Sequence, residues 1–110
     1  MTHIPVTYLS NAFSWNMLAS FPMSVNASEI TEASAAQYMR MGAVSAVGHQ
    51  STADVFSSEL GVPVPMQRTT VSLKGGDRLI VGQYRGPRLE EGVTSLPEGA
   101  TIQWLLVLIG

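Results

Sequence analysis

The chain has 110 residues, of which 45% are hydrophobic and only 13% are charged. That length suits one core, so we expect a single domain over residues 1–110. The net charge of −2 argues against a general binder of DNA, because such proteins carry a broadly basic surface. The charged share is about half of the usual value, which leaves too few polar groups to cover a monomer, and we therefore expect the chain to self-associate.

Missing residue types narrow the class of protein further. The chain has no Cys, which excludes a disulfide framework, a thiolate nucleophile and a Cys-ligated zinc. The N-terminus lacks the basic segment and apolar run of a signal peptide. The apolar run over 104–109 is far shorter than a bilayer-spanning helix. We expect a cytoplasmic protein with no membrane partner.

The first half of the chain is typical of short strands separated by helices. Pro22 ends a short helical pattern, Ser28 suits the N-cap of an amphipathic helix, and Gly42 suits its end. The expected elements are a strand over 4–9, a short helical segment over 10–22, a strand over 23–25, a helix over 29–41 and a strand over 43–47.

The second half predicts one more helix and then a hairpin. Ser51 or Thr52 can cap a helix that ends at Gly61. Two β-rich runs are joined by "KGGD", whose glycines allow a tight turn. The expected elements are a helix over 50–60, strands over 66–73 and 78–84, a loop over 85–99 and a strand over 101–109.

Together these elements predict an α+β (mixed α/β) fold. We expect one mixed sheet of about five strands flanked by helices. The last strand carries a continuous apolar run over 104–109, which places it in the middle of the sheet or at a contact between subunits.

His49 lies where a short strand meets a helix. The first N–H groups of a helix have no partner within it, and its dipole favours an anion, so a phosphate fits there. Ser51 and Thr52 can donate to the same oxygens, and an imidazole can pass a proton near neutral pH. The alternative is that Ser51 caps the helix and His49 fills a polar pocket.

A polar cluster, "SNAFSWN" over 10–16, directly follows the first strand. Neutral donors in such a place can recognise ribose hydroxyls or base edges. Helix capping explains the cluster as well.

Five of the six basic residues fall within the 21 residues from Arg68 to Arg88, which favours a local anion site. Arg88 precedes Glu91 in "RGPRLEEG", and arginine matches the geometry of phosphate. The alternatives are a solvated ion pair for Arg88 and plain strand surface for Arg68 and Gln83.

Several standard signatures are absent. The chain has no GxGxxG or GxxxxGK[ST] phosphate loop and no HExxH. His3 and His49 have no partners at metal-ligand spacing, so we expect no metal site. Ser51, His49 and Asp54 are too crowded for a hydrolase triad.

Four segments together resemble a known family. In chain order they are "YLSNAFSWNML", "SAVGHQST", "QR" and "RLEEG". Their order and separations resemble the small viral anti-CRISPR ring nucleases of archaeal viruses, phages and bacterial mobile elements, over nearly the whole chain. The chain departs from the family pattern at the "GP" before Arg88, which adds a residue after Gln83, and at Gln67, where an asparagine is common.

The resemblance implies a homodimer that binds cyclic tetra-adenylate, the messenger of type III CRISPR systems, and cleaves it to linear di-adenylate. A virus or prophage would thereby silence the defence in the host cytoplasm. By position, His49 matches the catalytic histidine and Glu91 its nearby carboxylate, while Arg88 and Arg68 match phosphate binders. The positions that match ligand contacts are Asn11, Ser14, Asn16, Ser51 and Gln83.

This chemistry requires neither a metal nor another cofactor. A ribose 2′-OH that is held in line attacks its own phosphorus and leaves a 2′,3′-cyclic phosphate. Arg88 and Arg68 would stabilise the extra charge, and protonated His49 would protonate the departing 5′-oxygen. Two alternatives stay open: a protein that sequesters a cyclic nucleotide without cutting it, and a structural or regulatory viral dimer that binds no nucleotide.

Overall fold

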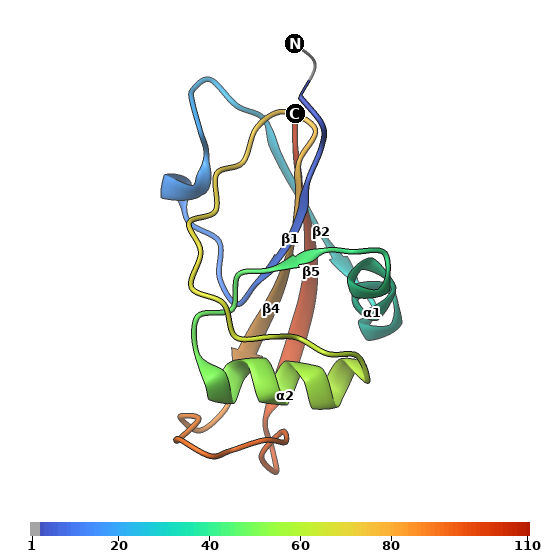
Figure 1. Ribbon diagram of the computed structural model, residues 1–110, viewed down its shortest axis with the longest axis vertical. Coiled ribbons are helices and arrows are strands. Elements are labelled where there is room, and N and C mark those ends of the chain that lie inside the picture. The colour runs from blue at the N-terminus through green and yellow to red at the C-terminus, as the bar shows by residue number, and fades with distance from the viewer. Residues whose placement is uncertain (1–2) are drawn as a thin grey trace.

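The sheet of the computed structural model has the strand order β2-β5-β4-β1-β3 (Figure 1). The structure describes residues 3–110, so the first two residues of the predicted domain lie outside the described range. β1 is parallel to β3 and to β4, whereas β5 is antiparallel to both β4 and β2. The strands are β1 (Thr7–Ser10), β2 (Val25–Ile30), β3 (Val44–Ser45), β4 (Arg78–Arg85) and β5 (Thr101–Ile109).

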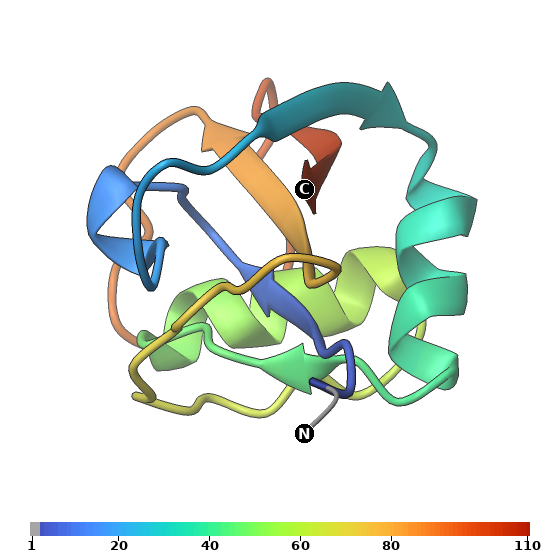
Figure 2. The same ribbon diagram turned by 90° about the horizontal axis from the view of Figure 1, so that it is seen from above.

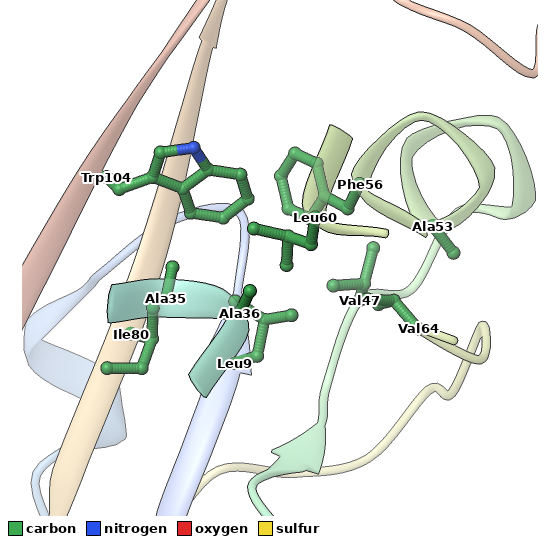
Figure 3. Close-up of a cluster of buried hydrophobic side chains, with 10 residues drawn as sticks. All are labelled: Leu9, Ala35, Ala36, Val47, Ala53, Phe56, Leu60, Val64, Ile80 and Trp104. Carbon is green, nitrogen blue, oxygen red and sulfur yellow. The ribbon is translucent and has the colours of Figure 1, made fainter. Parts of the chain in front are cut away.

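One face of the sheet is covered by both α-helices, α1 (Glu32–Arg40) and α2 (Gln50–Leu60). Figure 2 shows α1 on one side of the sheet and the short 3-10 helix η1 (Trp15–Met17) on the other. In the core beneath the helices, Phe56 of α2 meets Trp104 of β5 edge to face, with ring centroids 5.0 Å apart (Figure 3). This geometry is the one that aromatic pairs prefer.

A glycine of β4 makes that aromatic contact possible. A Cβ built on Gly82 would lie 2.6 Å from Phe56 and 2.6 Å from Trp104. Any other residue at this position would push the two rings off the sheet, so the close approach of α2 to β4 depends on Gly82.

The predicted helix over 29–41 starts too early. Residues 25–30 form β2, which pairs with β5 along its whole length, from Val25 opposite Ile109 to Ile30 opposite Trp104. α1 is then capped by Thr31, whose Oγ1 accepts from the Ser34 N–H at 3.1 Å. Ser28 is a suitable cap by type, but pairing with the long apolar β5 holds it in an extended backbone.

The predicted hairpin between 66–73 and 78–84 is wrong. The turn exists, since Asp77 N–H donates to Lys74 O at 2.9 Å, but β4 pairs with β1 and β5 instead. Both edges of β4 are thus occupied, and the segment before the turn makes only one isolated bridge, between Leu73 and Leu18. Its apolar residues pack on the face of the sheet away from the helices.

The predicted fold class is confirmed: residues 3–110 form an α+β domain with a five-stranded mixed sheet. β5 is an inner strand between β2 and β4, as its apolar sequence predicts. The N-terminal half differs in detail, because β1 covers 7–10 rather than 4–9 and only Trp15–Met17 is helical within 10–22. No helix within residues 3–110 is long and apolar enough to cross a membrane.

Candidate functional site

The carboxyl ends of the three parallel strands β1, β3 and β4 lie at one edge of the sheet. Asn11 directly follows β1, the 46–49 segment follows β3, and the loop Gly86–Gly92 follows β4. Figure 1 shows this loop beside α2, at the same end of the sheet. Ligands of open sheets bind outside the carboxyl ends of parallel strands, so the topology itself favours a site here.

A cavity of about 790 Å³ opens at this edge. Seven of the nine predicted site residues line it. They are Asn11, His49, Ser51, Arg68, Gln83, Arg88 and Glu91. Ser14 and Asn16 are not among the lining residues, because the chain turns away after Asn11 and these two belong to the cap and the body of η1.

His49 is the N-cap residue of α2. Its carbonyl accepts the first helical hydrogen bond, from Ala53 N–H at 3.0 Å, but its side chain makes no capping bond. The predicted caps Ser51 and Thr52 instead lie inside the first turn. The imidazole is therefore exposed and lines the cavity. It lies next to the first N–H groups of α2, and such groups at the start of a helix favour the binding of an anion.

Arg68 reaches this turn from a distant part of the sequence. Its Nε donates to Gly48 O at 3.2 Å, so the guanidinium side chain lies across the residue before His49. A Cβ on Gly48 would be in ordinary contact with Arg68 Cγ, at 3.6 Å. Gln67 N–H also donates to Val47 O at 2.8 Å, which holds the segment of Arg68 against the strand-to-helix connection.

The loop Gly86–Gly92 brings Arg88 and Glu91 into the lining of the same cavity. The Tyr84 hydroxyl donates to Pro87 O at 2.6 Å, and the Ser51 hydroxyl donates to Glu90 O at 2.8 Å. The loop is thus bonded both to β4 and to the first turn of α2.

The charged groups of the cavity are not paired with each other. Within residues 3–110 the one ion pair found joins His3 to Asp77, at the opposite end of β4. Across the same residues, no group of three or more His, Asp or Glu side chains is placed to hold a metal ion. The cavity is therefore lined by Arg68, Arg88, Glu91 and His49, none of which has an ionic partner among residues 3–110.

Two carboxyl groups with shifted pKa values lie away from this cavity. Burial raises the pKa of Glu32, and the neighbouring Glu59 raises it further through a hydrogen bond and charge repulsion. Burial alone would also raise the pKa of Asp77, but N–H groups of Lys74 and Val6 and the His3 ring stabilise the carboxylate and lower it overall.

Four lining residues escaped the sequence analysis as members of the site. They are Gln50, Tyr84, Gly86 and Leu89. Thr52, which the sequence offers as a phosphate donor beside Ser51, lines the cavity too. Gln50 directly precedes Ser51 in the "GHQST" turn, so its place follows from its neighbour. Tyr84 carried one usable signal, a phenol at the end of a strand just before the loop with Arg88.

The family model described as STIV B116-like matches residues 7–103 of the chain. Among solved structures, B116 of Sulfolobus turreted icosahedral virus is similar, with 26% sequence identity and a TM-score of 0.80. The match covers 94% of this chain and 98% of that one. No curated protein matches the chain.

Proposed function

The chain belongs to the STIV B116-like family, and from that premise we propose that it is a metal-independent ring nuclease. Its substrate would be cyclic tetra-adenylate, and its product linear di-adenylate that ends in a 2′,3′-cyclic phosphate. The biological role would be to antagonise type III CRISPR signalling in an infected cell. The proposal joins the resemblance of four sequence segments to the geometry of one cavity.

The observation that carries the proposal is the convergence of these segments on that cavity. Asn11, His49, Arg68 and Arg88 come from four separate parts of the chain and line the same space of about 790 Å³. The chain as a whole is poor in charged residues, which are 13% of it. Two guanidinium groups beside a helix N-terminus favour a phosphate group in particular.

The proposed reaction is an internal transesterification. The ribose 2′-oxygen bonds to the adjacent phosphorus, the bond from phosphorus to the 5′-oxygen breaks, and no water is consumed. Arg68 and Arg88 stabilise the extra negative charge on the phosphorane. Holding the 2′-oxygen in line with the leaving oxygen supplies much of the acceleration.

Two protons must move in this step. Protonated His49 gives its proton to the departing 5′-oxygen, since its exposed imidazole has no competing hydrogen bond within residues 3–110. Glu91 is the carboxylate of the cavity and accepts the 2′-hydroxyl proton. Asn11 and Gln83 are neutral and suit ribose hydroxyls and base edges.

We also propose that a second copy of the chain covers the face of the sheet away from the helices. A cavity of about 410 Å³ lies there, lined by apolar residues of β2, β4 and β5 and by Asn11 and Gln83. The last two line the candidate site as well, so a copy docked on this face would bring two sites together. In a two-fold dimer, each of the two copies of the site would then contact one half of a four-nucleotide ring.

The decisive experiment incubates the purified protein with labelled cyclic tetra-adenylate in EDTA. We expect linear di-adenylate from the wild type and none from His49→Ala. Tight binding without product from the wild type would replace the nuclease with a sequestering protein. No thermal stabilisation by any cyclic oligoadenylate would instead leave a dimer that binds no nucleotide.

Light scattering measures the molar mass in solution and therefore tests the proposed dimer directly. Leu105 faces the proposed contact, while Leu108 lies on the other face of β5 because side chains alternate along a strand. Leu105→Arg should give a monomer and Leu108→Arg should not. A wild type that is monomeric at all concentrations measured would end the dimer proposal.

A further inference from the structure

The two hydrogen bonds that hold the loop Gly86–Gly92 share one feature. Pro87 O accepts from the Tyr84 hydroxyl, and Pro87 directly precedes Arg88. Glu90 O accepts from the Ser51 hydroxyl, and Glu90 directly precedes Glu91. Each bond therefore fixes the peptide group from which one of the two charged cavity residues extends.

We propose that Tyr84 and Ser51 are positioning residues, whose hydroxyl groups hold Arg88 and Glu91 against the cavity. This inference rests on the proposed function for the reaction it serves. It assigns a role to Tyr84, which the sequence analysis did not select, and a different role to Ser51, which the resemblance assigns to ligand contact.

The hydrogen-bond inventory of Ser51 supports the second assignment. A serine hydroxyl has one proton to donate. Ser51 gives that proton to Glu90 O at 2.8 Å. A phosphate oxygen needs a donor, so Ser51 cannot serve a phosphate while this bond is intact. The N–H groups of the first turn of α2 remain as donors at the same place.

Packing at the start of the loop supports the first assignment. A Cβ built on Gly86 would lie 2.6 Å from Ala100 Cβ and 2.8 Å from the Tyr84 hydroxyl oxygen. The chain thus passes between Ala100 and the phenol with no room to spare. The phenol is half-buried beneath this passage and bonds to the next residue, Pro87.

The far end of the loop is fixed in a similar way. Glu90 O accepts a second bond, from Val93 N–H at 3.2 Å, which closes a turn through Gly92 with its φ of 90°. The Ser51 bond ties this turn to α2, and α2 carries His49 at its start. The hydrogen bond of the Ser51 hydroxyl therefore helps to fix the position of Glu91 relative to His49.

The kinetic test removes each hydroxyl group and measures the effect on the cleavage rate. Tyr84→Phe and Ser51→Ala should each lower kcat for cyclic tetra-adenylate by about 10-fold or more, the scale of small misplacements in active sites. Ser51→Thr keeps the hydroxyl and should restore most of the rate. Tyr38→Phe and Ser58→Ala are the matched controls and should match the wild type.

Double-mutant cycles separate positioning from direct participation. In the Arg88→Ala background Tyr84→Phe should change the rate by less than about 2-fold, and Ser51→Ala should do the same in the Glu91→Gln background, because coupled residues are not additive. Full effects that persist in both backgrounds would overturn the inference, as would full activity in the two single variants.

A second measurement does not depend on activity. Backbone ¹⁵N order parameters of residues 88–91 should fall from about 0.85, a rigid value, toward about 0.6 in Tyr84→Phe and in Ser51→Ala, but not in the two controls. Unchanged order parameters would contradict positioning even if cleavage falls. A wild type that cleaves no cyclic tetra-adenylate would end the proposed function, and the order parameters would then decide this inference alone.

Discussion

The two ends of β4 use charge in opposite ways. At its start Asp77 is 1% exposed, and its carboxylate accepts from the backbone N–H groups of Val6 and Lys74, each at 2.9 Å. His3 Nε2 lies 2.6 Å from the same group. At its end, Arg88 and Glu91 lie in an open cavity with no ionic partner within residues 3–110.

This contrast separates a structural use of charge from the binding and catalytic use that we propose. A buried carboxylate is tolerated only when hydrogen bonds replace its water. The Asp77 carboxylate accepts such bonds from the N-terminal segment and from the turn before β4. The backbone carbonyl of Asp77 also accepts from Ile109 N–H and so connects this turn to β5. The charges at the other end keep their hydration until a ligand displaces it. Such groups are the ones available for binding and catalysis.

The histidines give the sharpest way to break the comparison, because the chain has two and each lies at a different end of β4. His49→Ala should lower the cleavage rate by at least about 100-fold through loss of the general acid. His3→Ala should leave the rate unchanged within error. Steady-state cleavage of cyclic tetra-adenylate measures both, and equal losses in the two variants would abolish the distinction.

Arginines at the two ends allow a matched binding test. Arg88→Ala should weaken binding of cyclic tetra-adenylate by about 10-fold or more, the value of a hydrogen bond to a charged group. Arg78 is the exposed first residue of β4, and Arg78→Ala should bind as the wild type does. Isothermal titration with inactive His49→Ala as the parent protein gives the dissociation constants. A larger loss at Arg78 would move the anion site to the other end.

Asp77→Ala should lower the free energy of unfolding by about 2 kcal/mol, because buried N–H groups of Val6 and Lys74 lose their acceptor. Urea denaturation followed by circular dichroism checks this value. The matched variant Asp54→Ala removes a carboxylate whose one hydrogen-bond partner among residues 3–110 is the exposed Gln50, and it should lower the free energy of unfolding much less. Equal stability of wild type and Asp77→Ala would show that the buried cluster contributes nothing.

The smallest expected effect is the pH dependence from the same carboxylate. Hydrogen bonds hold the pKa of Asp77 below its ordinary value of 3.8. Its stabilising contribution is therefore complete above that ordinary value and is lost as the pH falls through the lowered pKa of the folded state. Denaturation curves at several acidic pH values should show a steeper loss for the wild type than for Asp77→Asn. Parallel curves would contradict this linkage.

Local signals in the sequence predicted the elements whose ends depend on neighbouring residues. The helix over 50–60 ends at Gly61, which has the positive φ of 67° that a C-terminal stop uses, and the structure places the end there. The helix over 29–41 fails at its start because strand pairing with β5 is a contact between residues about eighty positions apart. The predicted hairpin between 66–73 and 78–84 fails for the same reason. β4 pairs with β1 near the N-terminus and with β5 near the C-terminus, and not with the segment that directly precedes it.

The site shows the same division. The resemblance of four segments to a known family selected His49, Arg68, Arg88 and Glu91. Residue types alone left a polar pocket, plain strand surface and a solvated ion pair open as alternatives for these positions. Only the three-dimensional structure shows that Asn11 lines the cavity while Ser14 and Asn16 do not. It also shows that the Ser51 hydroxyl donates its proton to Glu90 O. Chemical type is a property of each residue alone, whereas hydrogen-bond partners depend on which distant segments the sheet brings together.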